Sequence, residues 1–166
     1  QLCLDRCLNC LLSMAGRNRK VKARMDLQTL LTREALKDLK ARFCLALDYK
    51  DWDTYAALFT QDGTIDVDGA VNTRGEAPEA QTCIRGRSAE TVHQIHSPIL
   101  DVLSPTQATG IWAMEDIVRT PDFLLEGRGH YRETYAIEDG KWRIASLHLT
   151  RIWLQMRPFQ DALPRA

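Results

Sequence analysis

The second half of the chain alternates apolar and polar residues over long runs, and this alternation constrains the fold more than any other feature. Runs at period two predict β-strands that bury one face. The pair Asp139-Gly140 separates the last two runs and is a strong signal for a two-residue hairpin turn. We therefore expect an antiparallel meander beyond Pro98. Its strands should extend over Ile99 to Leu103, Ala108 to Val118, Gly127 to Ile137 and Lys141 to about Leu154.

The residues ahead of this sheet predict helices instead. Apolar side chains recur at spacings of three and four between Thr32 and Asp48, which favours an amphipathic helix with Thr32 as its N-cap. Asp51 is positioned to cap a second helix from Trp52 to Phe59. Two helices are therefore expected before the first strand.

Two shorter segments complete the first half of the chain. Ile65 and Val67 alternate with acidic residues and predict a short strand, followed by a loop over residues 69–83. Ser88 is a good N-cap for a third helix, which would end around His96. Helices followed by a run of strands indicate an α+β fold, with the helices packed on one face of a curved antiparallel sheet.

The composition fits one globular domain. The chain has 166 residues, of which 45% are hydrophobic and 27% charged, enough to bury roughly two-thirds of its unfolded surface around a single core. Basic and acidic residues number 22 each, so the net charge gives no reason to expect a nucleic-acid partner. No apolar run approaches the roughly 20 residues that span a bilayer. We expect a soluble, cytoplasmic protein with no membrane partner and a small hydrophobic substrate.

Three of the five cysteines, Cys3, Cys7 and Cys10, lie close to the start of the chain. An odd number of cysteines argues against a disulfide framework. Their spacing resembles the iron–sulfur signature of radical adenosylmethionine enzymes, but the chain is far too short for the large barrel that accompanies it. We interpret residues 1–24 as an N-terminal extension, disordered or non-native, ahead of a single domain over residues 25–166. We expect neither a metal nor a cofactor.

Asp48, His96 and Asp116 are ionisable residues in segments that otherwise predict burial. Carboxylates and imidazoles are the groups that carry general acid-base catalysis. Asp116 shares its strand face with Trp112 and Met114, because side chains two apart point the same way. Burying an unpaired carboxylate is costly, so Asp116 should meet a cation or a histidine, line a polar cavity, or be wetted at the end of its strand.

Asp48 and Arg151 leave alternatives open as well. The helix dipole disfavours an acid at a helix C-terminus, so Asp48 either starts a turn or accepts a hydrogen bond from a histidine ring. Arg151 shares a predicted strand face with Leu147, Leu149 and Trp153. Its charge should therefore pair with an acid, bind an anionic ligand, or reach out to solvent.

The remaining histidines carry weaker signals. His93 precedes His96 by three residues, so on a helix the two would share a face, as metal ligands do. No His-Glu-x-x-His motif or cysteine pair accompanies them, and we predict no metal site there. His130 and His148 lie in predicted strands without distinguishing context.

Six groups of motifs follow one another along most of the chain. They are Ala46-Leu47-Asp48-x-x-Asp51-Trp52-Asp53, Leu58-Phe59-x-x-Asp62, Ile84-Arg85-Gly86-Arg87, His96-Ser97-Pro98, Ala108-Thr109-Gly110-Ile111-Trp112, and Tyr131-x-x-x-Tyr135-x-x-x-Asp139-Gly140-Lys141-Trp142-Arg143-Ile144. In this order they resemble the SnoaL-like branch of the nuclear transport factor 2-like superfamily, over roughly residues 28 to 157. The resemblance implies a cone of curved antiparallel sheet closed by helices, with the ligand inside, and a homo-oligomer, either a trimer or a dimer.

Further motifs look most like the bile acid 7α-dehydratase group. They are Trp112-x-x-Glu115-Asp116, the Tyr131/Tyr135 pair and Thr150-Arg151-Ile152. The resemblance implies that Asp48 and His96 match the Asp–His pair shared with scytalone dehydratase-like and dehydrochlorinase-like members. It further implies that Asp116 matches a second acid of the steroid dehydratase and Arg151 its late-strand arginine.

The chain departs from that group at two pocket positions. Phe43 and Val67 stand at positions where the resemblance to the bile acid enzyme implies tyrosines, so two hydroxyl groups are missing. Another phenol would have to hold a substrate oxygen, and the candidates are Tyr49, Tyr55, Tyr131 and Tyr135. Together with these positions, the aromatic and apolar residues expected in the pocket wall are Trp52, Trp112 and Met114.

These observations lead to one hypothesis and two alternatives. The hypothesis is a cofactor-free lyase that removes water from a steroid-like or polyketide-like hydroxy-carbonyl substrate. His96 would take the proton and Asp48 would orient the imidazole. Asp116 would either assist the leaving hydroxyl or act as a partner of His96 or Arg151. An isomerase or polyketide cyclase would need the same proton transfers without loss of water. A non-catalytic small-molecule-binding module is the third possibility, because one fold can carry many functions.

Overall fold

The computed structural model describes residues 26–67, 70–73 and 89–158. By its internal contacts the chain divides into two units, residues 1–30 and 31–166. Of the first unit the structure describes only residues 26–30, which begin a helix; the second unit holds all the other elements. The predicted N-terminal extension, with its three cysteines, lies outside the described residues.

Helix α2 extends over Leu27–Tyr49 and helix α3 over Trp52–Ala57. The prediction that Thr32 caps the first helix is wrong, because Thr32 lies inside α2 and Asp26 Oδ1 accepts the backbone N–H of Thr29 at 2.6 Å. The prediction that Asp51 caps the second helix is confirmed, since its side chain accepts from the Thr54 N–H at 3.1 Å. The predicted apolar stripe of α2 is buried: Leu36, Leu39, Phe43 and Leu47.

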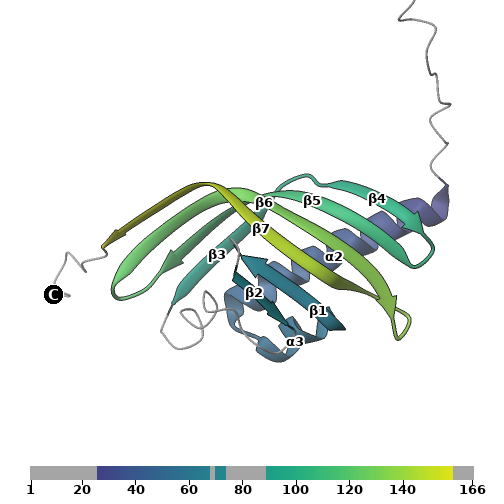
Figure 1. Ribbon diagram of the computed structural model, residues 1–166, viewed down its shortest axis with the longest axis horizontal. Coiled ribbons are helices and arrows are strands. Elements are labelled where there is room, and N and C mark those ends of the chain that lie inside the picture. The colour runs from purple at the N-terminus through teal and green to yellow at the C-terminus, as the bar shows by residue number, and fades with distance from the viewer. Residues whose placement is uncertain (1–25, 68–69, 74–88, 159–166) are drawn as a thin grey trace, which may run out of the picture. The chain divides into compact units, whose positions relative to one another are not determined.

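Seven strands form one sheet in the order β2-β1-β7-β6-β5-β3, with β4 paired to β5. Helices α2 and α3 lie on one side of this curved sheet, and its long strands arch over them (Figure 1). All the strand pairs are antiparallel except β1 with β7, which is parallel. The strands are β1 Phe59–Val67, β2 Ala70–Thr73, β3 Glu90–Ile95, β4 Ile99–Ser104, β5 Gln107–Arg119, β6 Phe123–Glu138 and β7 Lys141–Pro158.

The α+β prediction is confirmed, as is the meander of long strands beyond Pro98. The strand order has two ends, so over the described residues the sheet is curved and open, not a closed barrel. At the β6–β7 turn Asp139 has φ 52° and Gly140 φ 73°. Two successive positive φ values are the signature of the type I′ turn that the sequence predicted.

Two predictions in the first half of the chain are wrong. Residues 70–73, expected in a loop, form β2. The segment expected to form a third helix is strand β3, which pairs with β5 over its whole length. Thr91 and Val92 are β-branched, and Thr91, His93 and Ile95 are less exposed than Val92 and Gln94 between them. Ser88, the proposed cap, lies outside the described residues.

A β-bulge in β7 changes which residues of that strand share a face. Arg128 pairs with Trp153 and Gly129 with Arg151, so Ile152 is an extra residue without a cross-strand partner. The predicted common face of Arg151 and Trp153 is therefore wrong. Trp153 instead contacts Arg128, whose guanidinium carbon lies 4.9 Å from the centre of the indole ring.

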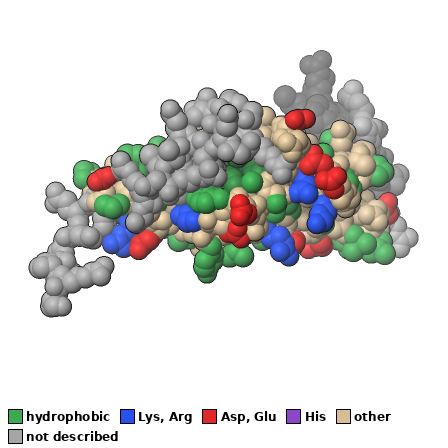
Figure 2. Space-filling view, turned by 90° about the horizontal axis from the view of Figure 1, so that it is seen from below, with side chains coloured by type: hydrophobic (Ala, Val, Ile, Leu, Met, Phe, Trp, Pro, Cys, Tyr) green, Lys and Arg blue, Asp and Glu red, His purple; other side chains and the backbone are tan. Residues whose placement is uncertain are grey.

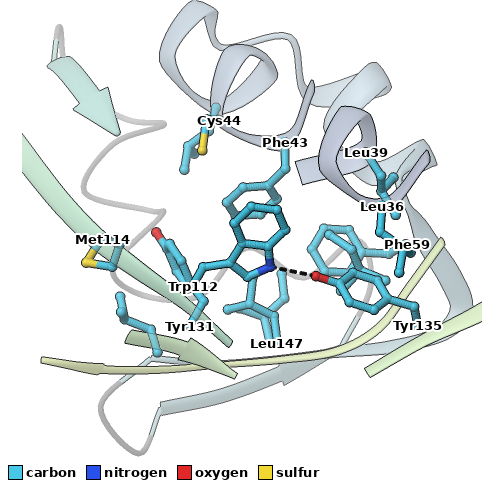
Figure 3. Close-up of a cluster of buried hydrophobic side chains, with 14 of the residues drawn as sticks. Leu36, Leu39, Phe43, Cys44, Phe59, Trp112, Met114, Tyr131, Tyr135 and Leu147 are labelled. Carbon is cyan, nitrogen blue, oxygen red and sulfur yellow. Dashed lines mark hydrogen bonds between the residues drawn. The ribbon is translucent and has the colours of Figure 1, made fainter. Parts of the chain in front are cut away.

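The core lies between the helices and the sheet (Figure 3). Phe43 is at the centre of an aromatic cluster, with ring centres 5.2 Å from Tyr55, 6.1 Å from Phe59 and 5.9 Å from Tyr131. Trp112 donates its indole N–H to the hydroxyl of Tyr135 at 2.8 Å, which satisfies a polar group that is fully buried. This packing fixes the wall of the cavity described below.

The surface mixes charges of both signs with apolar side chains, as Figure 2 shows for one face. This mixture agrees with the equal numbers of acidic and basic residues. None of the helices in the described part of the chain is long and apolar enough to cross a bilayer.

Candidate active site

A cavity of about 230 Å³ lies among residues of α2, α3 and the sheet. Most of its wall is apolar, and one histidine, one acid and one arginine interrupt it. An apolar cavity with a few convergent polar groups is the usual form of a small-molecule site. The lining residues are Phe43, Leu47, Tyr55, Ile65, Val67, His93, Asp116, Val118, Phe123, Leu125, Tyr131, Leu147, Leu149, Arg151 and Met156.

The histidine in this wall is His93, and it pairs with Asp48. Its ring Nδ1 lies 2.7 Å from Asp48 Oδ1, and its side chain is 5% exposed. An ionised carboxylate can only accept a hydrogen bond, so in this pair Nδ1 is the donor, and in the neutral tautomer of the ring the lone pair lies on Nε2. The helix C-terminus thus presents Asp48 to an imidazole, one of the two alternatives left open by the sequence.

Asp48 receives two more hydrogen bonds from strand β3. The backbone N–H of His93 donates to Oδ2 at 3.0 Å, and the hydroxyl of Thr91 donates to Oδ1 at 3.0 Å. Burial raises the pKa of Asp48, but the hydrogen bonds from His93 and Thr91 outweigh burial and hold the pKa below its usual value. Asp48 is therefore an ionised, fixed acceptor at neutral pH.

Asp116 is the direct cross-strand partner of His93 in the β3–β5 ladder. The two side chains therefore extend from the same face of the sheet, roughly 5 Å apart at their Cβ atoms. Asp116 is only 2% exposed, and Arg151 of β7 donates a hydrogen bond to its Oδ2. Of the alternatives for Asp116, a cationic partner on a cavity wall is the one found.

One oxygen of this buried carboxylate is left unsatisfied by the described part of the protein. Asp116 Oδ1 is buried and has no hydrogen-bond partner among the described residues. Leaving a buried charged acceptor unsatisfied costs about 1–3 kcal/mol or more. Since Asp116 lines the cavity, a bound molecule with a hydroxyl or amine hydrogen could supply the missing donor.

Two glycines of β6 allow Arg151 to reach Asp116 across that strand. Gly127 pairs with Asp116, and a Cβ built on it would stand 2.1 Å from Asp116 Oδ1 and 2.7 Å from Arg151 Nε. At Gly129 a Cβ would stand 2.1 Å from the backbone oxygen of Thr150, so the two strands approach closely at the bulge. The Gly-Arg-Gly sequence is the signal by which this ion pair could have been anticipated.

His96, the histidine expected to pair with Asp48, lies outside the cavity. It follows β3, its side chain is 52% exposed, and its Nε2 lies 3.4 Å from Glu115 Oε1. Residues 93 and 96 are separated by an odd number of positions in an extended segment, so their side chains face opposite ways. The predicted Asp48–His96 pair is wrong, because it relied on a helix where the chain forms a strand.

The expected pocket residues divide into three groups. Phe43, Tyr55, Val67 and Tyr131 line the cavity. Trp112 and Met114 are buried in the core on the same strand face as Asp116 but do not line the cavity, and Trp52 packs against the core. Tyr49 is 79% exposed and belongs to the outer surface of α2.

A buried network behind the cavity was not predicted. Lys40 Nζ lies 2.5 Å from Glu133 Oε1, with both side chains fully buried, and Tyr135 donates its hydroxyl to the other oxygen of Glu133. The Lys40 ammonium also lies 3.9 Å from the ring centre of Phe43 and 3.6 Å from that of Tyr131. It thus supports from behind two rings that line the cavity.

Two other groups near the cavity are held neutral. Burial raises the pKa of the Tyr131 phenol well above its usual value, so Tyr131 can donate a hydrogen bond throughout the physiological range. Burial likewise raises the pKa of Cys44 to about 11, so its thiol is not a nucleophile at neutral pH. Within the described ranges no three His, Cys, Asp or Glu side chains are grouped so as to hold a metal ion.

The fold of this chain recurs in known proteins. It is similar to a candidate scytalone dehydratase from Novosphingobium aromaticivorans, with 21% identity and a TM-score of 0.71 over 84% of this chain and 93% of that one. It is also similar to the hexachlorocyclohexane dehydrochlorinase LinA-type3 from Novosphingobium barchaimii, with 18% identity and a TM-score of 0.70 over 84% of this chain and 99% of that one.

A third similar structure is ActVI-ORFA from Streptomyces coelicolor, with 18% identity and a TM-score of 0.61 over 73% of this chain and 97% of that one. At these identities the structures agree in fold alone. The sequence itself matches the model of the SnoaL-like domain over residues 28–148, which is most of the chain. The protein therefore belongs to the SnoaL-like domain family.

Proposed function

We propose that this protein is a cofactor-independent lyase that eliminates water from a small hydrophobic hydroxy-carbonyl compound of steroid-like or polyketide-like type. The observation that carries the proposal is the His93–Asp48 pair, which faces an apolar cavity beside the Asp116–Arg151 pair. Structures of similar fold include a candidate scytalone dehydratase and a dehydrochlorinase, and both names denote elimination reactions. The family and these neighbours favour small-molecule lyase or cyclase chemistry.

In the proposed reaction His93 is the general base. Its Nε2 takes a proton from the carbon next to the substrate carbonyl, where the developing enolate stabilises the charge. Asp48 holds the ring by Nδ1 and stabilises the imidazolium that forms. Each such acid-base contribution is worth roughly 10² to 10⁴ in rate.

The leaving hydroxyl would be held by Asp116 and Arg151. Asp116 Oδ1 would accept the hydrogen of the hydroxyl, and the Arg151 guanidinium would stabilise the oxygen as the C–O bond breaks. The hydroxide then takes the proton from the His93 imidazolium and leaves as water, which restores the neutral base. His93 and Asp116 are cross-strand neighbours, which supports a transfer of the proton from the base to a hydroxide held beside it.

The unsatisfied oxygen of Asp116 favours loss of water over loss of halide. A hydroxyl group donates a hydrogen bond to that buried acceptor, whereas a carbon-bound halogen has no hydrogen to donate and would leave the carboxylate unpaired. A site with an unsatisfied acceptor therefore discriminates between substrates that can and cannot donate to it.

The test is to incubate wild type, His93→Gln and His96→Gln with a panel of β-hydroxy ketones of steroid and polyketide type and to follow product mass. We expect loss of one water with wild type and His96→Gln, and a rate at least about 10²-fold lower with His93→Gln. Turnover without change of mass would instead identify an isomerase, or a cyclase that releases no water. Binding without turnover by any of the three proteins would favour a binding module.

A homo-oligomer, trimer or dimer, is part of the same proposal. It is supported by apolar side chains that the single chain leaves exposed on β5 and β7, among them Ile117, Ile152 and Leu154. Light scattering coupled to size exclusion distinguishes trimer, dimer and monomer directly.

A further inference from the structure

Lys50 lies immediately after the helix that carries Asp48, in a backbone conformation that lysine seldom adopts. Asp51 N donates to Ala46 O at 2.9 Å and Lys50 N to Leu47 O at 3.4 Å. These two bonds form the Schellman motif, in which the residue after the C-cap is left-handed and usually glycine. Here that residue is Lys50, with φ 63°.

A lysine at this position carries a conformational cost that a glycine would avoid. Backbone strain in a folded protein points to a function when the strained residue also contacts a functional group. The side chain of Lys50 provides such a contact. Its ammonium lies 2.5 Å from Thr91 Oγ1, 3.0 Å from Asp48 O and 3.2 Å from Leu47 O.

Hydrogen bonds connect this ammonium to the His93 ring by way of Thr91 and Asp48. Lys50 donates to the Thr91 oxygen, the Thr91 hydroxyl donates to Asp48 Oδ1 at 3.0 Å, and the same Oδ1 lies 2.7 Å from His93 Nδ1. Because the ammonium occupies the acceptor side of Thr91, the hydroxyl hydrogen of Thr91 is directed to Asp48. One oxygen of Asp48 is thereby shared between a hydroxyl and the imidazole.

We propose that Lys50 is a positioning residue for the Asp48–His93 pair. Acting through Thr91, the positive charge of Lys50 offsets the negative charge of the Asp48 carboxylate, and His93 thereby keeps the neutral form that a general base requires. The proposal rests on the proposed function, since it assigns a role within the same catalytic pair.

The physical reason is a conflict built into any carboxylate–imidazole pair. A carboxylate orients the imidazole, but its negative charge also favours the protonated ring, which has no lone pair with which to accept a proton. A cation close to the carboxylate reduces the second effect and leaves the hydrogen bond in place. Lys50 meets this requirement without touching the ring itself.

The other charged groups near the pair do not replace Lys50. On α2 the thiol of Cys44, one turn before Asp48, stays neutral because burial raises its pKa to about 11. On β5 the partner of His93 is Asp116, whose charge is balanced by its ion pair with Arg151. Among the described residues, Lys50 is therefore the cation bonded to the Asp48 side of the pair.

The test is an NMR titration of the histidine rings in the free protein, which needs no substrate. Lys50→Met removes the charge and keeps the length of the side chain, while Lys50→Arg keeps the charge. We expect Lys50→Met to raise the titration midpoint of His93 by about half a pH unit to one unit, and Lys50→Arg to leave it close to wild type. His148, which pairs with Asp66 at 2.8 Å, is the internal control and should not move.

Thr91→Val tests the same connection from the other side, and it should also raise the His93 midpoint because it removes the hydroxyl that donates to Asp48. An unchanged His93 midpoint in folded Lys50→Met, or an equal shift in Lys50→Arg, would overturn the proposal. Since the titration follows the free protein, its failure is separate from that of the lyase proposal, which full turnover by His93→Gln would reject.

Discussion

Asp116 and Gly127 face each other across β5 and β6, and the absent side chain of Gly127 provides the space that the Asp116 carboxylate occupies. The ion pair of the cavity therefore depends on a residue that has no functional group of its own. We expect Gly127→Ala to displace Asp116 and Arg151, whose atoms lie 2.1 Å and 2.7 Å from the position of the new Cβ. The cost in stability should be about 1–3 kcal/mol, and kcat/KM should fall by about 10-fold to 100-fold.

Gly129→Ala is the matched comparison for this variant. Its Cβ would meet the backbone of Thr150 and not a flexible side chain, so the strands themselves must separate. Urea denaturation should show a larger loss of stability for Gly129→Ala than for Gly127→Ala. The reverse order would contradict the expectation that the side chains of Asp116 and Arg151 can move away from a Cβ at residue 127.

The Asp48 carboxylate should make the stability of the protein depend on pH at the acidic end. Its pKa in the folded protein is lowered from the usual value of 3.8, so its contribution to folding is present above that value and is lost as pH falls through the folded pKa. Asp48→Asn should weaken the dependence below about pH 4. Urea denaturation between pH 2.5 and pH 6 measures it, and Asp38→Asn, which alters an exposed residue of the same helix, is the control.

The buried Lys40–Glu133 pair should be far more sensitive to substitution than an exposed pair. Lys40→Met leaves the Glu133 carboxylate buried without its cation and should cost about 3–5 kcal/mol. Lys37→Met breaks the exposed pair with Glu34 on the same helix and should change stability by less than about 1 kcal/mol. Equal effects in thermal or urea unfolding would contradict the burial of the Lys40 pair.

Tyr131 should supply the phenol that Phe43 and Val67 do not. Its ring lines the cavity, and burial keeps the hydroxyl protonated, so it can donate to the carbonyl oxygen of a bound substrate. Tyr131→Phe should lower kcat by about 10-fold to 100-fold with little change in stability. Tyr135→Phe should instead lower stability, because it removes a hydroxyl that donates to Glu133 and accepts from Trp112.

The sequence was most informative where a local pattern decides the structure. The alternation over residues 108–118 and the Asp139-Gly140 pair predicted strands and a turn that the structure contains, because burial of one strand face and positive φ values leave a direct mark on residue type. The same logic was available for β3, where the β-branched residues Thr91 and Val92 favour a strand.

Pairings between distant segments could be anticipated only in part. An acid at residue 48 and an acid at residue 116 called for partners, and both have one, but which histidine pairs with Asp48 depended on whether β3 is a helix or a strand. Lys40 stands among Leu36, Phe43 and Leu47 on the buried stripe of α2, and this placement is the signal that it needs an acid. That the acid is Glu133 depends on sheet register.

The bulge at Ile152 divides the last strand into two stretches with separate tasks. Before it, β7 contributes Leu149 and Arg151 to the cavity; beyond it, with the faces exchanged, the strand contributes Met156. Substitutions in the later stretch can change the size of molecule that fits while the ion pair stays where it is. For a lyase of the proposed kind, changes confined to the end of one strand would therefore alter which substrates fit and leave the reacting groups in place.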